Sequence, residues 1–182
     1  MFDVDELLDT LVSALDEPTP PLAVKEALGR VVSRPTQVAD AMAPRAGGLR
    51  MLHRADDLTV IDATWAPGMR LLPHDHRMWA VIAIYQGAEE NEFYRRAPEG
   101  GLAESNGRRL ETGDVVVLGE STIHAVSNQT GAVTGAIHVY GGDFVDQPRS
   151  QWGPGDLVER PYDLELVLRE FHDANVAAGL AD

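Results

Sequence analysis

The chain has 182 residues, a formal net charge of −14 and no cysteine. This length predicts one domain, or at most a domain with a small appendage, and 44% hydrophobic with 24% charged residues is typical of a folded globular protein. The acidic balance disfavours binding to nucleic acid or to an anionic membrane, and the missing cysteines exclude disulfides and thiolate metal ligands.

The first part of the chain predicts helices. Residues 5–15 carry leucines at helical spacing, and the proline-containing stretch 17–21 then breaks the pattern. Residues 22–32 predict a second helix, and residues 36–45 a third short helix or a loop. The start of the chain is acidic, and no run of about 18 apolar residues follows, so we expect no secretory signal, no membrane span and a cytoplasmic location.

From residue 49 onward the pattern changes to short strands. Turn signals such as Gln86–Gly87 and Ser105–Gly107 separate them. Six or more short strands at this spacing predict an antiparallel sandwich or barrel. The strand-like stretches are residues 58–65, 79–85, 92–96, 115–118, 124–128 and 135–140.

A last helix is expected near the end of the chain. Asp163, soon after Pro161, is placed to cap a helix from residue 164 to about residue 177. The expected layout is a helical segment at 1–45, a β-barrel at 46–160 and a C-terminal helix at 161–182. We expect the helices to pack on the barrel as parts of one domain.

Two histidines in a short motif are candidate metal ligands. His74 and His76 flank Asp75, and in a strand residues two apart point to the same face, about 7 Å apart at the backbone. Two imidazoles placed in this way can converge on one metal ion, while Asp75 points away. The alternative is a polar loop histidine beside a buried one. His124, which follows a strand and a turn, is the candidate third ligand.

The spacing around these histidines resembles two motifs of the cupin superfamily over about residues 60–142. The matching positions are Gly68, His74, His76 and Gly87 in the first motif, and Gly113, His124 and Asn128 in the second. Gly119 and Ser121 replace a proline and a glycine of the second motif. The resemblance implies a mainly β fold, the double-stranded β-helix or jelly-roll barrel, with a metal ion held by the three histidines.

The first motif lacks its usual glutamate ligand. Ala80 and Val81 occupy the two positions where it would fall, which leaves three neutral histidines. A bound Fe²⁺ would keep both charges and have open positions, which favour thiolates or enolates together with O₂. The same set would accept Ni²⁺, Zn²⁺, Co²⁺ or Mn²⁺. Glu89, Glu90 and Glu92 are candidate replacement carboxylates, although the Glu89–Glu90 run by itself indicates a solvated turn.

Three-histidine cupins without the glutamate resemble thiol dioxygenases of the cysteine dioxygenase type. Trp65 stands nine residues before His74, as a tryptophan does in that family. The family's Ser-x-His-x-Tyr stretch corresponds to Ala136, His138 and Tyr140, which alternate onto one strand face. The resemblance implies that His138 orients the Tyr140 hydroxyl toward substrate and O₂, a relay that the loss of the serine puts in question. A buried, hydrogen-bonded polar pair is the alternative.

Thiol dioxygenases hold the substrate carboxylate with an arginine, whose planar, permanently charged fork suits that group. Arg50 lies nearest to the family's position, in front of the strand that bears the tryptophan, and Arg54 and Arg70 are also near. A solvated surface arginine is the alternative for each of them. Met78 and Ile82 fall on the same strand face as the histidines and are expected to line the pocket.

The resemblance therefore implies a mononuclear non-haem iron dioxygenase. It would oxidise a small thiol, such as cysteine or 3-mercaptopropionate, to its sulfinate with O₂, with Tyr140 and His138 as catalytic residues. One alternative is another three-histidine cupin that cleaves a β-diketone or enolate. A second is a non-catalytic cupin that binds a metal or a small ligand. The resemblance also allows a homodimer.

Overall fold

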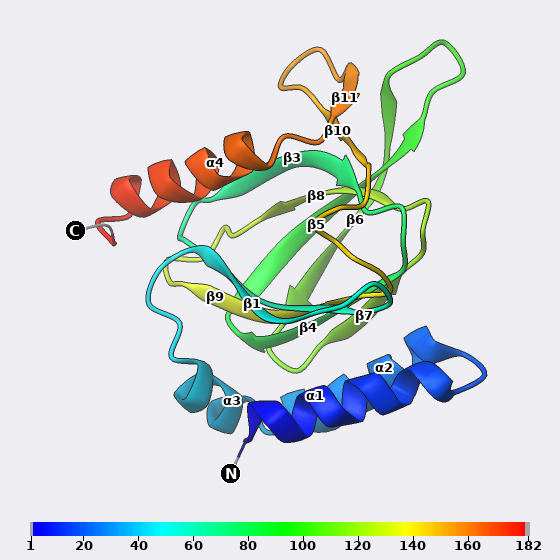
Figure 1. Ribbon diagram of the computed structural model, residues 1–182. Coiled ribbons are helices and arrows are strands. Elements are labelled where there is room, and N and C mark those ends of the chain that lie inside the picture. Colours follow the sequence, from blue (N-terminus) through cyan, green and yellow to red (C-terminus); the bar gives the residue numbers. More distant parts are fainter. Residues whose placement is uncertain (1, 181–182) are drawn as a thin grey trace.

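Two antiparallel sheets form the centre of the computed structural model, which describes residues 2–180 (Figure 1). The first sheet has the order β1 (Gly48–Arg54), β2 (Thr59–Trp65), β9 (Thr134–Tyr140), β4 (Ala80–Gln86) and β7 (Val115–Leu118). The second has the order β11 (Glu159–Pro161), β10 (Ser150–Trp152), β3 (Arg70–Asp75), β8 (Ile123–Ser127), β5 (Ala88–Arg96) and β6 (Leu102–Glu111). Because the chain alternates between the sheets, strands distant in sequence become neighbours. This arrangement is a double-stranded β-helix, the mainly β fold that was predicted.

Strand β4 shows how the sequence divides the barrel into an inner and an outer face. Ala80, Ile82 and Ile84 belong to the hydrophobic cluster that fills the barrel. Val81 and Tyr85, which point to the opposite face of the strand, belong to a second hydrophobic cluster outside the barrel. This alternation follows from the two-residue repeat of a strand, and both faces are apolar because both are covered.

The outer face of the first sheet is covered by the N-terminal helices (Figure 1). These are α1 (Val4–Ser13), a 3₁₀ turn (Ala14–Asp16), α2 (Pro20–Val32) and α3 (Pro35–Met42). Asp3 caps α1 by accepting hydrogen bonds from the backbone N–H groups of Asp5 and Glu6. The leucines at helical spacing point inward, and Leu11 and Leu28 are fully buried.

Helix α4 (Leu164–Ala177) closes the opposite side of the barrel, beside β3 (Figure 1). Asp163 caps it by accepting a hydrogen bond from the Leu166 N–H, as predicted. Its buried face reaches the barrel interior, where the Phe171 ring stacks on Trp65 with the centroids 5.5 Å apart. Within residues 2–180, none of the helices combines the length and the apolar character needed to cross a membrane.

Strand β6 replaces a turn that the sequence had predicted at Ser105–Gly107. In the structure these residues lie inside the strand, and Gly107 pairs with Glu92 of β5. The strand is at the edge of its sheet and is largely exposed, so it lacks the hydrophobic alternation that identifies a half-buried strand. Strands β10 and β11, with three residues each, are too short to produce such a pattern.

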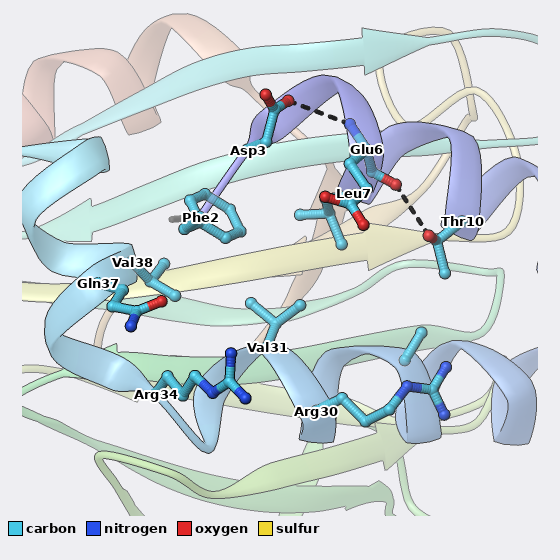
Figure 2. A pocket seen from close by; sticks show the side chains of 11 residues that line it. Phe2, Asp3, Glu6, Leu7, Thr10, Arg30, Val31, Arg34, Gln37 and Val38 are labelled. Atoms are coloured by element: carbon cyan, nitrogen blue, oxygen red, sulfur yellow. Dashed lines mark hydrogen bonds between the residues drawn. The ribbon is translucent and has the colours of Figure 1, made fainter.

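A cavity of about 230 Å³ lies among the N-terminal helices, on the far side of the first sheet from the barrel interior (Figure 2). The apolar residues Phe2, Leu7 and Val38 line it, and so do Arg30 and Arg34. None of the candidate metal ligands lines it.

Candidate metal centre

The fold brings His74, His76 and His124 together inside the barrel, as predicted. His74 lies on β3 directly opposite His124 on β8, and His76 follows β3 by one residue. All three side chains are buried, and one ring nitrogen from each lies within 4.8 Å of the others. Asp75, between the two motif histidines, points away from the cluster and accepts a hydrogen bond from the Ser150 backbone N–H.

Hydrogen bonds orient two of the three rings. Nδ1 of His74 lies 2.9 Å from the Leu72 carbonyl oxygen, and Nδ1 of His124 lies 2.8 Å from the Asn91 side-chain oxygen. Because both partners can only accept, Nδ1 carries the proton in each ring and the Nε2 lone pairs are left for a metal ion. Nε2 of His124 lies 3.3 Å from Nε2 of His76.

The electrostatics of the cluster favour neutral histidines. Burial lowers the pKa of His74 to about 4 and holds the pKa values of His76 and His124 well below their usual range. Nδ1 of His76 is buried without a hydrogen-bond partner among the described residues. Three convergent, neutral imidazoles fit a divalent transition metal such as Fe²⁺ or Zn²⁺.

No carboxylate of residues 2–180 joins the histidine cluster. Ala80, at the inward-facing position of the missing glutamate, is fully buried and pairs with Tyr140 on β9. Glu90 and Glu92 form ion pairs with Arg109 and Arg70 instead. The charge of a metal ion held here would therefore not be offset by a carboxylate ligand of the described chain.

Glu89 corrects one expectation from the sequence, because it is a fully buried residue and not part of a solvated turn. The turn ends at Gly87, whose φ of +74° and close approach to Thr134 exclude a larger residue. Strand β5 therefore begins at Ala88, and the Glu89 side chain becomes fully enclosed.

Hydrogen bonds connect Glu89 to the cluster. One carboxylate oxygen accepts from Nε1 of Trp65 at 3.0 Å, and the other accepts from the Asn91 amide at 2.9 Å. Asn91 in turn accepts from His124. Glu89 thus supports a ligand through Asn91 rather than acting as a ligand itself.

His138 and Tyr140 lie on the inner face of β9, where the sequence predicted them. Nδ1 of His138 lies 3.0 Å from the Tyr140 hydroxyl oxygen. The Tyr140 ring packs edge-on against His76, with the centroids 5.1 Å apart. Burial lowers the pKa of His138 to about 3 and raises the pKa of Tyr140 above its usual range. The pair therefore borders the metal centre in its neutral form.

The structure does not bring Arg50 to the histidine cluster. Its guanidinium pairs with Asp62 at 2.8 Å, and the other oxygen of Asp62 accepts from the Tyr85 hydroxyl at 2.7 Å. Tyr85 points to the outer face of the first sheet, and Arg50 also approaches Met42 of α3. Arg50 is therefore on the helix-covered side, because its position on β1 directs it away from the barrel interior.

Arg149 is the arginine beside the cluster, and the sequence reasoning missed it. Its guanidinium carbon lies 3.9 Å from the ring centroids of both Phe144 and Tyr162, so the group is held between two aromatic rings. Those rings are neighbours of the ligands: Phe144 is 6.1 Å from His76 and Tyr162 is 5.9 Å from His74. The charge of Arg149 is felt at the cluster, where it helps to lower the pKa of both histidines.

Arg149 has no acidic partner among residues 2–180, although its side chain is buried. It donates to the backbone carbonyl oxygens of Phe144 and Gln147, and its Nε has no hydrogen-bond partner among the described residues. A buried guanidinium without a carboxylate is unusual because the desolvation of its charge is not offset. No short motif marks this residue, since its burial depends on how the flanking segments that carry Phe144 and Tyr162 fold against the barrel.

Met78 and Ile82 both belong to the hydrophobic cluster inside the barrel, together with Tyr140 and Phe144. Ile82 pairs with His138 across β4 and β9. Both therefore lie on the inner side of the wall, the side on which the sequence placed them.

No family model matches the chain. Among solved structures, an RmlC-like cupin family protein from Methanocaldococcus jannaschii is similar over 56% of this chain and 85% of its own, with 9% identity and a TM-score of 0.47. A cupin superfamily protein from Desulfitobacterium hafniense is similar over 58% and 88%, with 16% identity and a TM-score of 0.47. KdgF from Halomonas sp. is similar over 52% and 78%, with 23% identity and a TM-score of 0.43.

Proposed function

We propose that this protein is a mononuclear non-haem iron thiol dioxygenase. Its substrate would be a small thiol that carries a carboxylate, such as 3-mercaptopropionate or cysteine, and its product the sulfinate. The observation that carries this proposal is Arg149, a buried guanidinium that has no acidic partner among the described residues and lies beside three neutral histidines.

An anionic ligand is what Arg149 lacks. Its free Nε can donate to a carboxylate oxygen, and charge-assisted hydrogen bonds of this kind are among the strongest in proteins. The stacked rings of Phe144 and Tyr162 hold the guanidinium in one place and limit its contact with water. Arg149 is therefore suited to bind and orient the carboxylate end of a substrate.

The other end of the substrate would meet the histidine cluster. His74, His76 and His124 would hold iron(II), which when bound supplies open positions and redox chemistry for a thiolate and O₂. Because the three ligands are neutral, an anionic sulfur would find its charge balanced there. The Tyr140 hydroxyl, held by His138, borders this place, and the aromatic walls exclude water from it.

The test is O₂ uptake by the full chain loaded anaerobically with Fe²⁺. We expect uptake and sulfinate formation with 3-mercaptopropionate or cysteine, and little with cysteamine, which offers Arg149 no carboxylate. His76→Ala should abolish uptake, whereas the surface variant Arg109→Gln should keep it, since Arg109 pairs with Glu90 and Glu111 away from the cluster.

Iron analysis of the same sample makes a negative result decisive. If iron is bound and no carboxylate-bearing thiol is consumed, the thiol dioxygenase proposal fails. Uptake with a β-diketone in place of the thiols would then favour cleavage of an enolate by the same three-histidine centre.

A further inference from the structure

Glu89 and His138 form a buried pair beside the metal centre. Oε2 of Glu89 lies 4.0 Å from Nε2 of His138, and both side chains are almost fully buried. Nε2 of His138 has no hydrogen-bond partner among the described residues. On the other side of the ring, Nδ1 is within hydrogen-bond distance of the Tyr140 hydroxyl.

Within residues 2–180, no polar group lies within hydrogen-bond distance of Nε2 of His138. Ala136, which precedes it on the same strand face, offers only a methyl group, and Ile82 lies opposite it on β4. The Trp65 ring is 5.9 Å from the His138 ring, and its one N–H already donates to Glu89. The carboxylate of Glu89, 4.0 Å away, is therefore the charged group that the structure places beside Nε2 of His138.

We propose that Glu89 is a positioning residue that fixes His138 as the Nε2–H tautomer and thereby sets the direction of the Tyr140 hydroxyl. A proton on Nε2 faces the carboxylate favourably, whereas a bare lone pair at 4.0 Å in a dry interior would be repelled by it. With Nε2 protonated, Nδ1 has only a lone pair and must accept the Tyr140 hydrogen.

This orientation determines what Tyr140 offers to the metal centre. Since the hydroxyl hydrogen is committed to His138, the oxygen lone pairs remain for a donor bound beside His76. Tyr140 then serves as a hydrogen-bond acceptor for an ammonium group or a water molecule at that place. The arrangement of protons stands on the structure alone, but its role in turnover rests on the thiol dioxygenase function proposed above.

The experiment is a long-range ¹H–¹⁵N NMR spectrum of the full chain labelled at histidine, recorded with and without Zn²⁺. Burial raises the pKa of Glu89 to about 7, so the sample is kept near pH 8.5, roughly 1.5 units higher, to ionise it. We expect the signal of His138, assigned by its loss in His138→Gln, to show a protonated Nε2 and an unprotonated Nδ1.

Three variants separate Glu89 from the other candidates. Glu89→Gln removes the charge, and its amide can donate to Nε2, so the Nε2–H preference should be lost. Glu90, the next residue on β5, forms an exposed ion pair with Arg109, so Glu90→Gln should leave the tautomer of His138 unchanged. Tyr140→Phe removes the hydroxyl but keeps the carboxylate, so His138 should stay Nε2–H.

The proposal is overturned if the wild-type ring is protonated at Nδ1, if Glu89→Gln leaves the tautomer unchanged, or if Tyr140→Phe inverts it. Should Glu89→Gln fail to fold, the wild-type and Tyr140→Phe spectra still decide. In turnover, we expect Glu89→Gln to lower kcat about 10- to 100-fold with a smaller change in KM, and to cost nothing further in the Tyr140→Phe background. The spectra report the tautomer of His138 without any turnover. The tautomer proposal can therefore be tested even if the thiol dioxygenase proposal fails.

Discussion

At the scale of single residues, the buried guanidinium of Arg149 is the feature that most specifically favours an anionic ligand. If it binds the substrate carboxylate, Arg149→Gln should raise KM for 3-mercaptopropionate, because a hydrogen bond to a charged group contributes about 1.5–3 kcal/mol, or roughly 10- to 100-fold. Arg149→Lys keeps the charge but not the planar fork, so its effect should be smaller. Steady-state O₂ uptake measures both.

Arg109→Gln is the matched control for this prediction, since Arg109 forms ion pairs with Glu90 and Glu111 at the surface. An unchanged KM in Arg149→Gln, in a protein shown by circular dichroism to be folded, would show that the carboxylate is bound elsewhere. A parallel rise of KM in Arg109→Gln would point to a general electrostatic effect on an anionic substrate.

The histidines and the two arginines show what a sequence reveals about a site. His74, His76 and His124 could be predicted because strand geometry and motif spacing are local properties. Arg149 could not, because its burial depends on Phe144 and Tyr162, one on each side of strand β10. Arg50 was assigned by its distance along the chain, and the alternation of β1 directs it to the outer face.

At the scale of elements, Asp75 connects the ligand-bearing strand β3 to strand β10, which begins directly after Arg149. Its buried carboxylate accepts from the Ser150 N–H at 2.7 Å and pairs with Arg77 and Arg96. Asp75→Ala leaves that N–H without a partner, so we expect the free energy of unfolding to fall by about 1–3 kcal/mol. Urea denaturation measures this loss.

The same variant should loosen β10 and β11, which hydrogen exchange at residues 150–162 would detect as faster exchange than in the wild type. Asp156→Ala is the control within the same segment, because Asp156 makes an exposed ion pair with Arg160. Equal loss of protection in both variants would contradict a specific role for Asp75.

The elements that the sequence predicted well are those with a covered face. Strands β2, β4, β7, β8 and β9 and helix α4 repeat their apolar residues at the period of their structure, and each was found within a few residues of its observed ends. Strand β6 was not predicted because its side chains are exposed. The burial of Glu89 was not predicted because the turn ends at Gly87, earlier than the polar residues after it indicate.

At the scale of the whole molecule, the buried histidines make the metal-free fold sensitive to acid. Burial lowers the pKa of His74 to about 4 and that of His138 to about 3, and His76 and His124 are also held low. Below about pH 6.5 the unfolded chain therefore binds protons that the folded chain does not, and the free energy of unfolding falls as the pH falls.

Two carboxyl groups, one buried and one half-buried, act in the opposite direction. Burial raises the pKa of Glu89 and of Glu170 to about 7, so both favour the folded state at acid pH and oppose it as the pH rises through 7. Four histidines outnumber them, so we expect the metal-free protein to lose stability from pH 6.5 toward pH 4. Urea titrations across this range measure the slope, and a flat profile would contradict the neutral cluster.

Metal binding should counter this acid sensitivity in a pH-dependent way. A ligand that binds only the folded state at about 100 times its Kd stabilises it by about 2.7 kcal/mol, so Zn²⁺ should raise the melting temperature at pH 7.5. Protons compete for the same Nε2 lone pairs only near the low pKa values of the folded cluster, so the gain should persist to about pH 5 and shrink toward pH 4. His76→Ala should lose most of the gain, whereas His53→Ala, outside the cluster, should keep it. An equal gain in both variants would place the zinc at some other site of this acidic chain.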